Sequence, residues 1–171
     1  EPEQVMELVN KIGDNARETI SNLSDIVWSI NPGNDSGEKV YNRMESFASL
    51  VLSSKGIKLN FNNSEALNTL NYKMEAKQNL FLIFKEAINN AAKYSQANNG
   101  RVQFDKVDAN MVMKIEDNGI GFDTAKFSQG NCLKNIKTRA TALSGSVAIK
   151  STTKGTAITL QFPLEQLLFL S

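Results

Sequence analysis

Two polar side chains four residues apart have the chemistry to hold a metal ion. Glu86 and Asn90 belong to an apolar-periodic segment, residues 74–97, and residues four apart lie on one side of an α-helix. A carboxylate and a carboxamide offer oxygen ligands, which Mg²⁺ prefers while it keeps several waters. A solvated helix face with an ordinary mixture of Glu and Lys is the alternative interpretation of this segment taken alone.

A second candidate site follows a strand-like run. Asp117 stands just after the run 112–115, and Gly119 and Gly121 follow it. A carboxylate there could accept a hydrogen bond from an exocyclic amine, and the two glycines would let the backbone approach a ligand closely. The segment lacks the third glycine and the downstream acidic residue of a dinucleotide-binding fingerprint. A plain turn after a strand is therefore the alternative.

Two further segments carry groups suited to a phosphate and a base. Gly130 begins the entry into a predicted helix, 132–144, whose first turn holds Leu133. A helix N-terminus presents unpaired N–H groups and a positive potential to phosphate. Gly155 and Thr156 begin the last predicted strand, where the Thr hydroxyl could donate or accept at a base edge, directly or through water. A capped surface helix and a hairpin turn are the alternatives.

The elements that must position these residues follow from the hydrophobic periodicity. Spacings of three and four predict helices, and alternation predicts strands. The predicted helices are 3–30, 37–55, 74–97 and 132–144, and the predicted strands are 57–61, 102–107, 111–115, 146–151 and 156–162. Residues 64–72 are expected to form a loop. Strands grouped in hairpins with helices between them indicate an α+β fold, a two-layer sandwich of one mixed sheet with helices on one face.

The long N-terminal helix that precedes this sandwich is expected to need a partner. Its apolar or small residues recur at every third or fourth position from Val5 to Ile30, and Asn31-Pro32-Gly33 ends it. A rod of this length cannot bury such a stripe against itself. We therefore expect it to pair with another helix, although a core helix of the same domain is the alternative.

The composition excludes several classes of function. The chain of 171 residues has a formal net charge of +1, so no overall field favours nucleic acid. It contains no histidine, which excludes a histidine metal site, a Ser-His-Asp triad and a phosphoryl-accepting histidine within these residues. A single cysteine, Cys132, excludes an internal disulfide. No apolar run approaches the roughly 20 residues that span a bilayer, and the charged, polar residues 1–20 do not resemble a signal peptide. The first residues, Glu-Pro-Glu, lead us to expect a fragment of a longer protein.

Taken together, the four segments resemble the motifs of one superfamily. They are Glu86-Ala-Ile-Asn-Asn90-Ala-Ala-Lys93-Tyr94, Asp117-x-Gly119-x-Gly121, Gly130-x-x-Leu133 and Gly155-Thr156. Their order is similar to the N box, the two glycine boxes and the closing Gly-Thr of the GHKL ATPases, which include sensor histidine kinases, gyrase, Hsp90 and MutL. Residues 25–32 and 133–145 resemble the sensor histidine kinases in particular, and the whole resemblance covers about residues 20–162.

The resemblance implies a role for each candidate residue. ATP and Mg²⁺ would be the cofactors, with Asn90 and Glu86 at the metal and Asp117 accepting a hydrogen bond from the adenine amine. Residues 120–131 would form a lid over the phosphates. The residues around the nucleotide would be Asn90, Tyr94, Asp117, Gly119, Gly121, Gly130, Leu133 and Thr156. Cys132 stands where the second glycine box usually has another glycine, and Tyr94 where histidine is common in this kinase group.

The resemblance also implies a reaction and its partners. Glu86 and Lys93 would be the catalytic residues of γ-phosphoryl transfer to a histidine outside this fragment, with Glu86 either a general base or a group that orients the metal. The partners would be the protein's own phosphoacceptor helix, a second copy in a homodimer, and the receiver domain of a response regulator. The setting would be a cytoplasmic domain of a membrane-anchored sensor kinase.

The same resemblance divides the chain into three parts. Residues 1–31 would be the second helix of a dimerisation and phosphoacceptor hairpin whose first helix is absent, 32–163 the ATP-binding catalytic domain, and 164–171 an apolar tail. The chain would then bind ATP without phosphorylating itself. Two alternatives come from other classes: a GHKL ATP hydrolase or protein-serine kinase, and a non-catalytic interaction module that keeps the fold.

Overall fold

The computed structural model describes residues 2–122 and 131–169. In chain order the elements are α1 Pro2–Ile30, the 3₁₀ turn η1 Pro32–Asn34, α2 Gly37–Ser53, β1 Lys58–Asn63, α3 Glu65–Asn68, α4 Met74–Tyr94, β2 Asn99–Val107, β3 Asn110–Asp117, α6 Asn131–Ala142, β4 Ser146–Thr152, β5 Gly155–Pro163 and α7 Leu164–Leu167.

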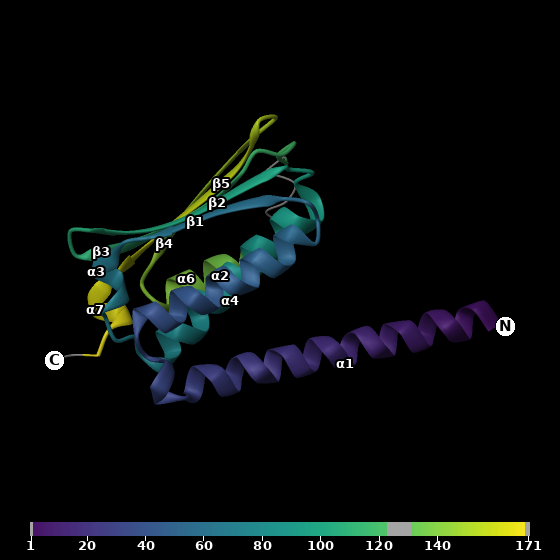
Figure 1. Ribbon diagram of the computed structural model, residues 1–171, viewed down its shortest axis with the longest axis horizontal. Helices are drawn as coiled ribbons and strands as arrows, with labels where there is room; N and C mark the ends of the chain where they lie inside the picture. Colours follow the sequence, from purple (N-terminus) through teal and green to yellow (C-terminus); the bar gives the residue numbers. More distant parts are fainter. Residues whose placement is uncertain (1, 123–130, 170–171) are drawn as a thin grey trace.

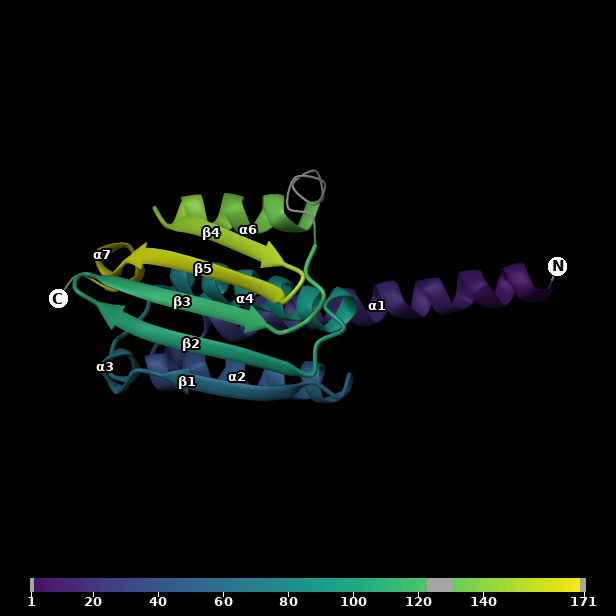
Figure 2. The same ribbon diagram turned by 90° about the horizontal axis from the view of Figure 1, so that it is seen from above.

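One mixed five-stranded sheet forms the centre of the domain, in the order β1-β2-β3-β5-β4. β1 is parallel to β2, and all other neighbours are antiparallel. Helices α2, α4 and α6 cover one face of the sheet (Figure 1), and Figure 2 shows the strands side by side with these helices behind them. The predicted α+β sandwich of one mixed sheet with helices on one face is therefore confirmed.

The core lies between the sheet and its helix layer. Every second residue of the central strands points into it, as alternation requires. On β3 these residues are Met111, Met113 and Ile115, and on β5 they are Ile158, Leu160 and Phe162. Helix α4 supplies the facing stripe at helical spacing, with Leu80, Ile83, Phe84, Ala87 and Ile88 buried. The alternating residues of the strands and the helically spaced residues of α4 thus form one continuous apolar layer.

Three local features differ from the sequence expectation. Helix α4 ends at Tyr94 rather than at 97, because Gln96 takes a positive φ of 53° and the Ser95 hydroxyl accepts the N–H of Ala97. The expected loop 64–72 contains the one-turn helix α3. The apolar end of the chain packs on the domain: Leu167 of α7 is fully buried and its carbonyl accepts the N–H of Lys73. Burial of α7 depends on tertiary neighbours that a local pattern does not reveal.

Helix α1 contacts the helix layer near its C-terminal end and extends beyond the domain at its N-terminal end (Figures 1 and 2). Except for the partly buried Trp28, its large apolar side chains are exposed, namely Val5, Met6, Leu8, Val9, Ile12, Ile20, Leu23, Ile26, Val27 and Ile30. The residues that α1 buries are polar, Asp25 and Ser29. The domain therefore does not bury the stripe, and pairing with a partner helix stays a prediction. Among the described residues, no helix combines the length and apolar character needed to cross a bilayer.

Asp25 fixes the end of α1 to two helices of the domain. Its carboxylate accepts from Arg43 of α2 at 2.6 Å and from Lys85 of α4 at 2.7 Å. The Arg43 guanidinium also lies over the ring of Trp28, 4.6 Å from its centroid, and over Phe81 at 4.8 Å. Cation–π contacts of this kind add to the ion pairs when they are partly desolvated. The last turns of α1 are thus held by charge and by ring stacking rather than by the apolar stripe.

A buried lysine anchors the segment between α1 and α2. The Lys77 side chain on α4 has no solvent exposure, and its ammonium donates to Asp35 at 2.6 Å and to the Asn31 carbonyl at 3.1 Å. An ammonium group without such partners could not be buried in its charged form at a tolerable cost. The connection from α1 into the domain is therefore tied directly to the core.

Two tyrosine hydroxyls share a buried hydrogen bond in the same core. The oxygens of Tyr41 and Tyr72 are 2.6 Å apart, and the Met111 sulfur lies 3.4 Å from the first. Burial raises the pKa of Tyr72 to about 12. Burial also raises the pKa of Tyr41 well above its ordinary value, and the neighbouring Tyr72 adds to this shift.

We expect the free energy of unfolding to fall as the pH rises from 10 to about 12. The folded protein holds these two protons more tightly than the unfolded chain, so their stabilising contribution is complete below pH 10 and is lost above it. The slope is at most about 1.4 kcal/mol per pH unit for each tyrosine. Urea unfolding at about pH 9 and pH 11 would measure the fall, which should be smaller in a Tyr72→Phe variant. An equal fall in both proteins would count against this explanation.

Candidate functional site

A cavity of about 210 Å³ lies where α4, α6 and the paired ends of β3 and β5 meet. Its lining residues are Ala87, Asn90, Ala91, Tyr94, Ser95, Ile115, Asp117, Gly121, Phe122, Leu133, Thr156 and Ile158. Mostly apolar walls with a few polar groups are typical of a small-molecule site. The volume is below the roughly 300–1,000 Å³ of pockets for drug-sized ligands and suits a single ring system.

Six of the candidate residues from the sequence share this cavity. They are Asn90, Tyr94, Asp117, Gly121, Leu133 and Thr156. Two pairings of elements bring them together. Asp117 ends β3 directly opposite Thr156 on β5, and Asn90 and Tyr94 are one helical turn apart on α4. Leu133 is buried at the start of α6, so its side chain forms part of the apolar wall. Gly130 lies outside the described residues.

Asp117 is the charged group of the cavity. Burial raises the pKa of its carboxyl above the usual value, and hydrogen bonds from the backbone N–H groups of Gly119 and Thr156 oppose this rise. The Gly119 N–H donates to Asp117 Oδ1 at 2.9 Å. Two oxygens offer about four acceptor positions, so the carboxylate keeps capacity for a further donor. A perturbed carboxyl inside a cavity is a marker of a functional site.

The glycines of this region are required by the protein's own backbone. A Cβ on Gly119 would lie 2.0 Å from the Ser95 carbonyl oxygen, and one on Gly121 would lie 2.0 Å from the Thr152 carbonyl oxygen. Gly121 also has a positive φ of 64°, which side chains rarely tolerate. The sequence suggested glycines that let the chain pass beside a ligand. The structure shows that they let the ends of α4 and β4 close around the cavity.

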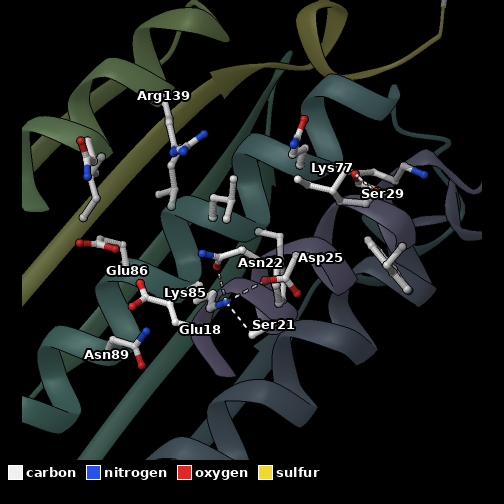
Figure 3. A pocket seen from close by; sticks show the side chains of 18 of the residues that line it. Glu18, Ser21, Asn22, Asp25, Ser29, Lys77, Lys85, Glu86, Asn89 and Arg139 are labelled. Carbon is white, nitrogen blue, oxygen red and sulfur yellow. Dashed lines mark hydrogen bonds and ion pairs between the residues drawn. The ribbon is translucent and has the colours of Figure 1, made fainter. Parts of the chain in front are cut away.

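Glu86 and Lys93 line a different pocket. This second pocket, about 600 Å³, lies between α1, α4 and α6 and contains both acidic and basic side chains, among them Glu18, Asp25, Lys85, Glu86, Lys93 and Arg139. Figure 3 shows Glu86 and Arg139 on facing helices of this pocket, with Lys85 bound to the side chains of α1. Four residues advance a helix by about 40° beyond one full turn. That rotation separates Glu86 from Asn90, which lines the apolar cavity.

The two pockets differ in what they could bind. In the polar pocket the Lys85 ammonium already pairs with Asp25 and Arg139 already donates to Asn79 at 3.2 Å. The smaller cavity combines apolar walls with the acceptor Asp117 and the buried Thr156, which suits a flat heteroaromatic ring better. Among residues 2–122 and 131–169, no cluster of three or more Asp, Glu, Cys or His side chains could hold a metal ion by itself.

Two serines that were not predicted from the sequence contribute to the site. Ser95 caps α4, and its carbonyl oxygen accepts the Ile120 N–H at 2.8 Å. Ser151 Oγ accepts the Phe122 N–H at 2.8 Å and lies 3.1 Å from the Thr156 hydroxyl. The predicted hairpin held a signal for the second contact, since pairing 146–151 with 156–162 across its turn places Ser151 opposite Thr156.

The fold and the cavity agree with a comparison of the sequence with protein families. Residues 75–166 match the family described as "Histidine kinase-, DNA gyrase B-, and HSP90-like ATPase". The chain belongs to this family. The matched range extends from α4 to α7 and includes every described residue that lines the 210 Å³ cavity.

Several curated relatives of this family member are named as histidine kinases or sensor proteins. The chain is 31% identical over 86 residues to sensor histidine kinase ComP of Bacillus subtilis, a match of 48% of this chain and 11% of ComP. It is 32% identical over 84 residues to the histidine-protein kinase/phosphatase UhpB of Salmonella typhimurium, 49% of this chain and 17% of UhpB. It is 33% identical over 92 residues to sensor protein VraS of Staphylococcus epidermidis, 53% of this chain and 26% of VraS. These matches thus cover about a quarter or less of the relatives' own lengths.

Solved structures show the same fold. The blue-light activated histidine kinase of Erythrobacter litoralis superposes with a TM-score of 0.70 at 16% identity, covering 91% of this chain and 50% of that one. Full-length ShkA in complex with AMPPNP superposes with a TM-score of 0.68 at 16% identity, covering 96% of this chain and 39% of that one. The five-stranded sheet with its helix layer is therefore the fold of histidine kinase catalytic domains.

Proposed function

We propose that this family member is the ATP-binding catalytic domain of a two-component sensor histidine kinase. It holds Mg-ATP for transfer of the γ-phosphoryl group to a histidine outside these residues. The observation that carries this proposal is the apolar cavity in which Asp117 and Thr156 meet as a strand pair. Its apolar walls suit a purine ring, and Asp117 suits the exocyclic amine that distinguishes adenine.

Asn90 is the residue proposed to hold the magnesium ion. It lines the cavity from α4, and Mg²⁺ at a nucleotide is commonly held by one or two protein ligands together with phosphates and waters. A single carboxamide oxygen fits that requirement without an acidic cluster. When bound, the ion would neutralise phosphate charge during transfer. Tyr94, one turn further along α4, borders the same cavity and would limit access to the nucleotide.

Glu86 and Lys93 are proposed to act on the side of the phosphoryl acceptor. Both line the pocket that α1 borders, where a neighbouring phosphoacceptor helix would lie if α1 forms part of a helical hairpin. Phosphoryl transfer depends mainly on positioning and on charge neutralisation. Glu86 would accept a proton from the attacking imidazole, and the ammonium of Lys93 would offset negative charge.

The exposed stripe of α1 supports the proposed assembly. Ten large apolar side chains on one helix remain exposed, and a partner helix would bury them. We propose residues 1–31 as the second helix of a dimerisation hairpin and 32–163 as the catalytic domain. A receiver domain of a response regulator is the proposed partner for relay of the phosphoryl group. We also propose that this catalytic domain lies on the cytoplasmic side of a membrane-anchored sensor kinase.

A labelling experiment with γ-labelled ATP tests the reaction. The present chain, which has no histidine, should bind the nucleotide and take up no acid-labile, base-stable label. A longer version that includes the upstream helix should take up such label, and Glu86→Gln should slow it by about 100-fold or more if the carboxylate is a general base. Acid-labile label on the present chain, or steady hydrolysis of ATP by it, would contradict the proposal.

A further inference from the structure

We infer that Ser151 makes the Thr156 hydroxyl a hydrogen-bond donor toward the cavity. Ser151 would thereby determine which base edge the cavity accepts. The inference rests on the proposed binding of ATP, because it concerns the adenine end of that same site. Ser151 lies on β4, one strand away from the wall of the cavity. It is a positioning residue that acts on the ligand through Thr156.

The hydrogen bonds around Ser151 favour one direction for its proton. The Phe122 N–H is only a donor, so Ser151 Oγ accepts there, at 2.8 Å. The other partner of Ser151 Oγ within the described chain is the Thr156 hydroxyl at 3.1 Å. A hydroxyl has one proton and two lone pairs. The arrangement that uses the Ser151 proton within the protein is donation to Thr156 Oγ1.

Donation from Ser151 leaves the proton of Thr156 free to point at a ligand. Thr156 is 8% exposed and lines the cavity, so its hydroxyl lies beside the space that a ligand would occupy. Asp117, its strand partner, is an acceptor. The cavity therefore presents an acceptor next to a donor along one edge.

This pattern matches adenine and opposes guanine. The Watson–Crick edge of adenine has a donor at the N6 amine and an acceptor at N1, whereas guanine has an acceptor at O6 and a donor at N1. Asp117 would accept from N6 while Thr156 donates to N1, directly or through one water. If Ser151 did not fix the proton, the Thr156 hydroxyl could rotate and accept as readily as it donates.

The backbone geometry holds the relay in place. Ser151 and Thr156 are directly opposite each other in the β4–β5 pair, so their side chains lie on the same face. Gly121 brings the chain so close that a Cβ there would lie 2.9 Å from Ser151 Oγ. The bond from Phe122 then occupies one lone pair of Ser151. Strand register and a glycine thus orient a hydroxyl that does not itself line the cavity.

A cycle of two proteins and two ligands tests the inference. The ligands are ATP and 1-deaza-ATP, which keeps the N6 amine but has a C–H in place of N1. In the wild-type chain, 1-deaza-ATP should bind about 2- to 12-fold more weakly than ATP. In Ser151→Ala, ATP binding should weaken by a similar factor and the penalty for 1-deaza-ATP should fall below about twofold.

Two further variants separate this role from a structural one. Thr156→Val removes the donor itself and should abolish the 1-deaza penalty in the same way, which keeps the inference testable if Ser151→Ala folds poorly. Ser146→Ala, an exposed position on the same strand, should leave both affinities unchanged. Equal weakening of ATP and 1-deaza-ATP by Ser151→Ala would overturn the inference and leave ATP binding established. A wild-type chain that binds neither nucleotide would overturn the proposed function itself.

Discussion

Asp117→Asn is expected to weaken ATP binding by about 10- to 100-fold, the loss of a hydrogen bond to a charged group. Two backbone N–H groups, from Gly119 and Thr156, already donate to this carboxylate, and the adenine amine would be the third donor. All three need acceptors, whereas Asn offers one oxygen and one NH₂ group. At least one donor would therefore face another donor. Calorimetric titration with ATP would measure the change.

The matched control for this variant is Glu116→Gln. Glu116 is the preceding residue of β3 and pairs with Lys114 at 2.8 Å, and successive strand residues point to opposite faces. The control should bind ATP as the wild type does. Binding by Asp117→Asn within about threefold of the wild type would show that the carboxylate does not recognise the base, because the lost bond would then be worth less than an ordinary one.

Loss of binding in Asp117→Asn should not come from unfolding. Burial raises the pKa of Asp117, so the folded chain holds this proton more tightly than the unfolded one. The ionised carboxylate therefore opposes folding, and its contribution to stability declines as the pH rises from the ordinary Asp value through the raised one. A neutral Asn does not experience this decline. We expect the variant to melt at or above the wild-type temperature near neutral pH, when both lack nucleotide.

Asp35→Asn is expected to lower the free energy of unfolding by about 3–5 kcal/mol, as when one partner of a buried ion pair is removed. Lys77 is fully buried, and Asp35 supplies its only carboxylate partner within the described chain. What remains would be the Asn31 carbonyl at 3.1 Å and the face of Trp28 at 5.6 Å. Urea denaturation of the variant and the wild type would measure the loss.

An exposed ion pair on the same chain provides the control. Asp14 and Arg17 of α1 are 2.8 Å apart, with 77% of each side chain exposed, and Asp14→Asn should cost no more than about 0.5 kcal/mol. Lys77→Met removes the buried charge together with its need for a partner, so it should cost much less than Asp35→Asn. Equal losses for Asp35→Asn and Asp14→Asn would show that burial of Lys77 does not matter.

The part of the fold set by local patterns could be predicted from the sequence. Alternation placed the strands, and spacings of three and four placed α1, α2, α4 and α6. The residues of the cavity could be named only through the family resemblance, because Asp117 and Thr156 belong to different hairpins and meet only when β3 pairs with β5. Features that depend on tertiary neighbours could not be predicted from local patterns. The pattern of α4 gives no sign that Lys77 is buried, since its partners Asn31 and Asp35 lie in the preceding connection.

Two details of the site depend on contacts between elements that are far apart in the sequence. Glu86 and Asn90 share a helix side by spacing, yet the presence of α1 and α6 divides that side into two pockets. Ser151 has no ligand-facing position, and its contribution appears only when the loop around Phe122 is placed against β4. In both cases the function of a residue depends on which element lies opposite it.

The most direct test of the central claim is to map ATP binding by heteronuclear NMR on the present chain with Mg²⁺. If the nucleotide occupies the 210 Å³ cavity, the largest amide shift changes should fall on Asn90–Ser95, Asp117–Phe122 and Thr156. Changes confined to the charged walls of the larger pocket, around Glu18, Asp25 and Lys85, would place the ligand elsewhere. No change at millimolar ATP would contradict nucleotide binding by this chain altogether.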